Sequence, residues 1–193
     1  QFNELAEKDY LLKTSSGHPY IHRWLPYPFD ASYPHLLPSG IVDFTNPDAY
    51  RWYRDMHKPL FDIGVSVMKV DYGESIPEDT VAFNGDTGQK LHNVYSLLYN
   101  KCVYEATEKY SHDKGSLVWG RAGWSGSQRY PMQWGGDPQC DWEGLAASIR
   151  GGLSWGMSGA PYYSHDIGGF TVGQPETELY IRWAQVGVMM SHT

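Results

Sequence analysis

Apolar residues occur in short runs along this chain, and longer stretches with one apolar side separate the runs. The short runs cover residues 41–44, 65–70, 117–121, 132–134 and 160–164, and each is typical of a buried strand. The longer stretches predict helices over residues 46–62, 91–110, 141–152 and 176–190. Strands that alternate with helices predict an α/β fold with a parallel sheet.

The chain before the first predicted strand has no regular period. Residues 2–13 suggest the tail of a helix and an edge segment, and five prolines interrupt residues 14–40. A loop of this length in a compact domain is usually functional or disordered, and its aromatic residues favour an ordered loop at the rim of a site.

In the helix predicted over residues 46–62, Asn46 is a suitable N-cap and Pro47 suits the first turn.

Three of the predicted strands are followed by an aspartate in a turn that contains glycine. Asp71 follows the run VSVMKV, Asp137 follows MQWGG, and Asp166 follows APYYSH. A single aspartate at a strand end is often only a turn former or a helix cap, so the series of three carries the argument. The carboxyl ends of parallel strands form the active-site face of a (β/α) barrel, and also of an open doubly wound sheet. Two carboxylates on one rim are what acid/base hydrolysis of a glycosidic bond requires.

Other site chemistries find less support in the pattern. No Gly-x-Gly-x-x-Gly follows a predicted strand, so the nucleotide-binding form of the open sheet lacks its phosphate cradle. His165 and Asp166 are metal-ligand types, but a third ligand at suitable spacing is absent. The sequence therefore predicts no metal and no cofactor.

Composition narrows the partners further. At 193 residues the chain can form one domain with a sizeable core. Its net charge of −7 and the lack of a basic stripe argue against a nucleic-acid partner. The apolar runs are far shorter than the roughly 20 residues that a membrane span needs. Aromatic residues make up 15% of the chain, which suits sugar rings but equally suits a large core.

Several segments of the chain resemble glycoside hydrolase family 31. They are KVDYGE (69–74), WGGD (134–137) and SHDIGG (164–169), supported by DFTNP (43–47), GSQRYP (126–131) and SIRGGLS (148–154). Within the family the chain is most similar to the α-xylosidase branch. Family members have a (β/α)8 barrel flanked by β-sandwich domains. The resemblance therefore implies that residues 1–193 are one partial barrel domain, roughly strands four to seven with their helices, from a longer chain.

The resemblance also implies roles for particular residues. Family members hydrolyse α-glycosides with retention, which makes Asp71 the nucleophile and Asp137 the general acid/base. The positions implied to bind, line or brace the sugar are Lys69, Arg121, Trp134, His165 and Asp166.

The two carboxylates need opposite charge states at the start of the reaction. Asp71 must be ionised, and Lys69 and Arg121 as nearby cations would favour its charged form. Asp137 must be protonated, so we expect it against apolar surface such as Trp134 or close to Asp71, either of which raises its pKa. Two further acidic residues are alternative carboxylates, Glu74 and Glu143, although Glu143 better suits the first turn of a helix.

The expected substrate is an α-linked oligosaccharide or α-glycoside that loses its terminal sugar, with α-xylose as the leading candidate. An α-glucosidase or transglycosylase differs only in pocket shape and acceptor, which the sequence does not separate. Four aromatic residues of the 14–40 loop are candidates for filling the space of a hydroxymethyl group: Trp24, Tyr27, Phe29 and Tyr33.

Two alternatives belong to other classes of protein. A sugar-binding module that reuses the rim would have lost one of the carboxylates, and neither is lost. A fragment that contributes only packing is the other alternative, and the 193 residues by themselves are expected to be inactive. No Asn-x-Ser/Thr sequon marks a secreted protein, so the compartment stays open with a leaning towards the cytoplasm, and a homo-oligomer remains open as well.

Overall fold

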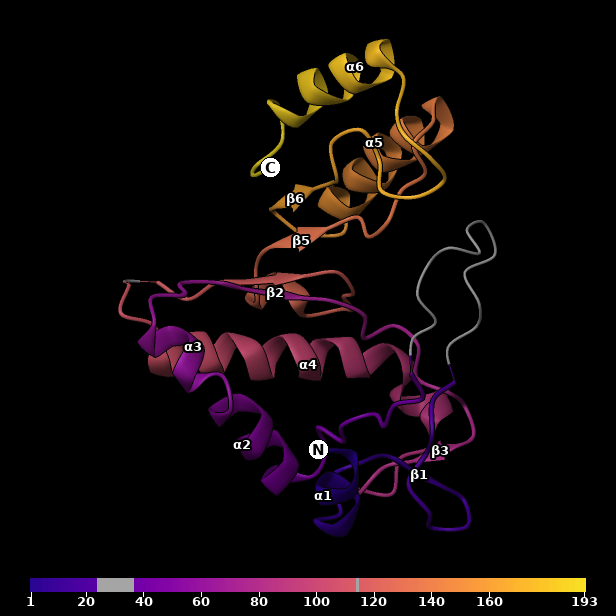
Figure 1. Ribbon diagram of the computed structural model, residues 1–193, viewed down its shortest axis with the longest axis vertical. Helices are drawn as coiled ribbons and strands as arrows, with labels where there is room; N and C mark the ends of the chain where they lie inside the picture. Colours follow the sequence, from indigo (N-terminus) through magenta and orange to yellow (C-terminus); the bar gives the residue numbers. More distant parts are fainter. Residues whose placement is uncertain (24–36, 114) are drawn as a thin grey trace.

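A four-stranded parallel sheet organises the molecule. The computed structural model describes residues 1–23, 37–113 and 115–193 (Figure 1). The strands lie in the order β2-β4-β5-β6, and every neighbouring pair is parallel, which confirms the predicted α/β fold. Their bounds are Met68–Val70 for β2, Val118–Gly120 for β4, Gln133–Trp134 for β5 and Tyr163–Ser164 for β6.

The strand register separates two faces of this sheet. Lys69 pairs with Trp119, and the Trp119 and Trp134 rings lie 6.1 Å apart, so these side chains share one face. On the other face, Val70 and Val118 pack against Val103 of the long helix α4, Gly88–Tyr110. Because β2 and β4 are covered by α4 on that face, the polar and aromatic side chains gather on the opposite one.

The remaining long helices cover the other end of the sheet. Helix α5 spans Trp142–Met157 and helix α6 spans Thr177–Gly187, and both lie beside β5 and β6 in Figure 1. Leu145 of α5 packs with Leu179 and Trp183 of α6, and these three side chains are buried. A short 3-10 helix, η1 (Ser127–Arg129), lies in the connection between β4 and β5.

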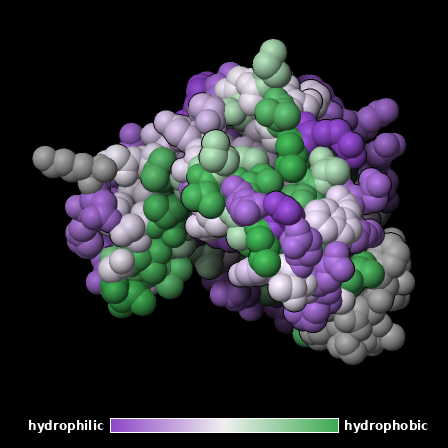
Figure 2. Space-filling view, turned by 90° about the horizontal axis from the view of Figure 1, so that it is seen from above, coloured by the Kyte–Doolittle hydropathy of each residue, from purple (hydrophilic) through white to green (hydrophobic). Residues whose placement is uncertain are grey.

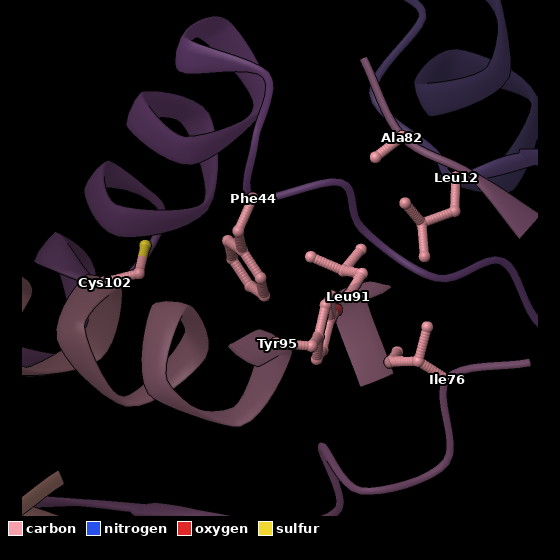
Figure 3. Packing of buried hydrophobic residues seen from close by; sticks show 7 residues of the cluster. All are labelled: Leu12, Phe44, Ile76, Ala82, Leu91, Tyr95 and Cys102. Atoms are coloured by element: carbon pink, nitrogen blue, oxygen red, sulfur yellow. The ribbon is translucent and has the colours of Figure 1, made fainter. Parts of the chain in front are cut away.

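The N-terminal part of the chain packs against the opposite side of α4. It contains helix α1, Phe2–Glu7, and strand β1, Lys13–Thr14, which pairs antiparallel with β3, Thr80–Val81. Phe44 lies between this part and α4, close to Tyr95 and Leu91 (Figure 3). The strand predicted over residues 41–44 was wrong, because that segment forms only an isolated bridge between Val42 and Leu11.

The helix predicted over residues 46–62 is broken in two. Helix α2 spans Pro47–Asp55 and helix α3 spans Lys58–Asp62. Pro59 lies in the first turn of α3. A backbone N–H at this position has no acceptor within the helix, so proline, which lacks an N–H, breaks no helical hydrogen bond there. In a continuous helix its ring would clash with the carbonyl of the residue four positions earlier, so the chain begins a new helix instead.

Helix α5 runs five residues beyond its predicted end at residue 152. The structure continues the helix through the Gly151–Gly152 pair and uses Gly152 for close packing. A Cβ on Gly152 would lie 2.5 Å from Cδ1 of Tyr163 on strand β6, so only glycine lets the helix approach the strand this closely.

Apolar side chains are also exposed on the surface. Figure 2 shows green apolar patches interspersed with hydrophilic residues on the face seen from above. The most exposed large apolar side chains are Met157, Met189, Leu37, Val188 and Ile63. Within the described residues, no helix combines the length and the apolar character needed to cross a bilayer.

The Asn46 cap provides a test of the local fold. Its side-chain oxygen accepts a hydrogen bond from the Asp48 backbone N–H at 2.9 Å, which confirms the predicted N-cap, and its amide donates to the Asp9 carbonyl at 2.9 Å. We expect Asn46→Ala to lower the free energy of unfolding by about 1–2 kcal/mol in urea denaturation of the full-length protein. Asn46→Asp keeps the capping oxygen and should lose less. Equal stability of the alanine variant and the wild type would contradict the assignment.

Candidate active site

The predicted site residues lie where the strands end. Asp71 comes directly after β2 and Arg121 directly after β4, while Asp137 and Asp166 follow β5 and β6 within three residues. Because the four strands are parallel, these positions share the carboxyl edge of the sheet. A cavity of about 860 Å³ opens there. Its walls include Tyr72, Glu74, Arg121, Trp134 and Asp137. Asp71 lines a smaller adjoining cavity of about 210 Å³, and Tyr72 is part of both walls.

The guanidinium of Arg121 joins the two candidate catalytic carboxylates. Its Nη1 lies 2.9 Å from Oδ1 of Asp71 and 3.5 Å from Oδ2 of Asp137. Because the same Nη1 lies close to both oxygens, Oδ1 of Asp71 and Oδ2 of Asp137 can be at most about 6.4 Å apart, which is the sum of the two distances. Inverting glycosidases hold their carboxyl groups about 6.5–9.5 Å apart and retaining enzymes about 5–5.5 Å apart. The separation is therefore compatible with direct attack by one carboxylate.

The backbone around Asp71 and Arg121 fixes their relative positions. The Arg121 backbone N–H donates to the Val70 carbonyl at 3.0 Å, which ties the end of β4 to the residue before Asp71. Tyr72 has a φ of 61°, an unusual value for a residue with a side chain, and its N–H donates to Asp71 Oδ1 at 2.8 Å. Gly136 also has a positive φ, 74°, and its backbone packs along the Arg121 side chain. These turns direct Asp71 and Asp137 towards the same guanidinium.

Burial and charge together set the protonation of Asp137. Partial burial is the main cause that raises its pKa, the Arg121 guanidinium opposes this, and the negative charge of Asp71 adds to the increase. Asp166 shows the same pattern, since burial raises its pKa most and Lys69 opposes it. Asp137 and Asp166 therefore both hold a proton to higher pH than an ordinary aspartate does.

Lys69 points to the aromatic face of the sheet. Its Nζ lies 4.3 Å from the centre of the Trp134 ring and 5.1 Å from that of Trp119. Among the described residues, no carboxylate lies within ion-pair distance of this ammonium group. The two indoles hold the cation without neutralising it.

His165 lies apart from the cavity. Its ring is buried, and its Nδ1 accepts a hydrogen bond from the Trp183 indole N–H at 2.8 Å. Because an indole nitrogen only donates, Nδ1 carries no proton, and burial lowers the pKa of the ring. In the part of the chain that the structure describes, Nε2 has no partner, and His165 belongs to the wall of neither cavity.

The two alternative carboxylates lie in very different places. The Glu74 carboxylate accepts a hydrogen bond from Nη2 of Arg121 and lines the larger cavity, whereas Glu143 is exposed in the first turn of α5. Sequence reasoning did not identify the link between Glu74 and Arg121. The spacing of Glu74, three residues after Asp71 across a glycine turn, was the available signal. Over residues 1–23, 37–113 and 115–193, no group of three or more His, Cys, Asp or Glu side chains gathers as metal ligands.

Comparisons with known proteins identify the family. All 193 residues match the family described as "Glycosyl hydrolases family 31 TIM-barrel domain". An α-xylosidase of Emericella nidulans is 44% identical over 155 residues, which are 80% of this chain and 20% of that protein. The α-xylosidase XylQ of Lactiplantibacillus pentosus is 38% identical over 205 residues, covering 100% of this chain and 24% of that protein.

Solved structures show the same likeness. A family 31 sulfoquinovosidase from E. rectale, in complex with an aza-sugar inhibitor, superimposes with a TM-score of 0.83 at 32% identity. The alignment covers 97% of this chain and 28% of that one, so the chain spans only a fifth to somewhat over a quarter of these relatives. The family match over the full chain and the parallel sheet lead to one conclusion: the chain belongs to glycoside hydrolase family 31 and forms part of its TIM-barrel domain.

Proposed function

We propose that the protein containing this chain is a retaining, exo-acting α-glycoside hydrolase. The observation that carries the proposal is the single Arg121 nitrogen that lies within 3.5 Å of both Asp71 and Asp137. It places two carboxylates from different strand ends close enough for double displacement through a covalent glycosyl-enzyme. A sugar-binding module would have no need for this pair of acids.

The two carboxylates take different roles because their surroundings differ. Asp71 is the more exposed of the pair and pairs more closely with Arg121, which suits an ionised nucleophile that attacks the anomeric carbon. Asp137 has a raised pKa and protonates the glycosidic oxygen as the bond breaks. It then accepts a proton from the water that hydrolyses the glycosyl-enzyme. The negative charge of Asp71 stabilises the oxocarbenium-like transition state electrostatically.

The substrate contacts follow from the same rim. Arg121 and Trp134 line the larger cavity, while Lys69 lines neither cavity and holds its ammonium group over the Trp134 ring. Asp166, with its raised pKa, is a further polar group at the strand ends. His165 is implied to bind the sugar, which requires its Nε2 to face the cavity. The ring is buried, however, and His165 lines neither cavity, so its position does not support this role.

An α-xyloside is the substrate that we propose. Two relatives bearing the name α-xylosidase, 44% and 38% identical, support it. An α-glucosidase remains the second candidate, since both enzymes use the same chemistry. The aromatic residues expected to shape this choice, Trp24, Tyr27, Phe29 and Tyr33, lie outside the described residues.

Removal of the nucleophile should abolish turnover. We expect Asp71→Ala in the full-length protein to lower kcat by at least roughly 10⁴-fold on every α-glycoside, because the variant lacks the carboxylate that forms the covalent intermediate. Asp62→Ala, which removes a surface carboxylate of α3, is the matched control and should keep wild-type activity. Substantial turnover by the Asp71 variant would exclude the assigned role.

The loss of activity caused by removing the acid should depend on the leaving group of the substrate. Asp137→Ala should lower kcat/KM by roughly 10²- to 10⁴-fold on an alkyl α-glycoside, and by less than about tenfold on a glycosyl fluoride, which needs little protonation. Steady-state kinetics on the two substrates measures the difference. Equal losses on both would show that Asp137 is not the proton donor.

Substrate preference is measured with a panel of aryl α-glycosides. We expect the α-xyloside to have a kcat/KM roughly 10- to 200-fold above the α-glucoside and the α-galactoside, the range that a pocket achieves against one extra small group. A higher value for the glucoside would overturn the xylose proposal and leave the retaining chemistry intact.

A further inference from the structure

The carboxylate of Glu74 holds the second arm of the Arg121 guanidinium. Nη2 of Arg121 donates to Oε1 of Glu74, while Nη1 faces Asp71 and Asp137. Glu74 lies in the same loop as Asp71, three residues later, and lines the larger cavity. Three carboxylates therefore converge on one guanidinium.

The planar fork of arginine makes this third contact geometrically important. A guanidinium is rigid, so a bond that fixes Nη2 also fixes the direction of Nη1. The Tyr72 ring lies below the same group, with its centre 4.9 Å from Cζ of Arg121. The bond to Glu74 therefore restricts rotation of the guanidinium within its plane. Without Glu74, Nη2 would be free to turn towards either Asp71 or Asp137.

Glu74 also changes the charge balance around Asp137. The charged groups that act on Asp137 come from three strand ends: Lys69, Asp71 and Glu74 from β2 and its loop, Arg121 after β4, and Asp166 after β6. Arg121 and Lys69 favour the ionised form of Asp137, whereas Asp71 and Glu74 disfavour it. Part of the Arg121 charge is thus offset by Glu74 rather than by the acid itself.

We propose that Glu74 is a positioning residue that acts through Arg121, directing Nη1 between the two catalytic carboxylates. This inference rests on the proposed function, because it assigns Asp137 as the acid. A purely structural ion pair would affect stability alone, and a direct substrate contact would affect binding instead.

A titration without substrate tests the charge effect. In the full-length protein with ¹³C-labelled aspartate, assigned by comparison with Asp137→Asn, we expect Glu74→Gln to lower the pKa of Asp137 by roughly 0.5–1 unit. The sign follows from the removal of a negative charge, which makes ionisation of Asp137 easier. Glu143→Gln removes the same charge from an exposed residue of α5 and should leave this pKa unchanged. Identical pKa values in the Glu74→Gln and Glu143→Gln variants would overturn the proposal, whatever the enzyme hydrolyses.

Kinetics of the same variants test the positioning. Glu74→Ala should lower kcat by roughly 100-fold with little change in KM, as expected when a catalytic group is misplaced. Glu74→Gln keeps an oxygen that can accept from Nη2 and should lose less than about tenfold. With an alkyl α-glycoside, the basic limb of its kcat/KM profile should move to lower pH, and with a glycosyl fluoride it should stay in place.

Three outcomes would contradict the proposal. Unchanged kcat in both Glu74 variants would leave Glu74 no part in the reaction. A large rise in KM with kcat preserved would make it a substrate-binding residue. Lower thermal stability with wild-type kcat would make it only structural. A wild-type protein inactive on every α-glycoside would instead count against the proposed function, and the titration would still decide the effect of Glu74 on Asp137.

Discussion

The shared guanidinium of Arg121 is the interaction on which the site depends. It is held by Glu74, it contacts Asp71, and it reaches Asp137, so acids from two separate strand ends take their positions from one cation. The main-chain bond from Arg121 to the Val70 carbonyl fixes that cation to the sheet. Partial burial is the main cause that raises the pKa of Asp137; Arg121 and Lys69 oppose it, and the negative charges of Asp71 and Glu74 add to the increase.

One face of the sheet packs against α4 and stabilises the strands, and the other face carries polar and aromatic side chains beside the strand ends. Val70 and Val118 pack against Val103 of α4 and anchor the strands from one side. Lys69 and the indoles of Trp119 and Trp134 occupy the other side, next to the strand ends that bear the acids. Strand alternation thus puts Lys69 on the same face as the two indoles while Val70, its neighbour in β2, belongs to the core. The site rests on strands whose other face is fixed by apolar packing.

Predictions from short sequence patterns were correct where the residues in the pattern have a single common structural role. Asn46 before Pro47 predicted a helix start and caps α2. Such predictions were wrong where the same residues suit two different structural roles. The helix predicted to end at residue 152 continues to Met157, and Gly152 allows it to pack on Tyr163. The 41–44 run has the composition of a strand, yet its side chains, Phe44 among them, are used to pack against α4, and only Val42 forms a bridge.

The sequence by itself determined the fold class, because strand periodicity and the glycine turns after each strand are local properties. The resemblance to the family implied the roles of Asp71 and Asp137. The sequence also placed Asp71, Arg121 and Asp137 at the ends of their strands. Only the tertiary structure decided which groups meet. The contact between Glu74 and Arg121 and the burial of His165 against Trp183 join residues 47 and 18 positions apart in the sequence. Such contacts depend on how the loops and helices pack around the sheet, which periodicity along a single chain does not encode.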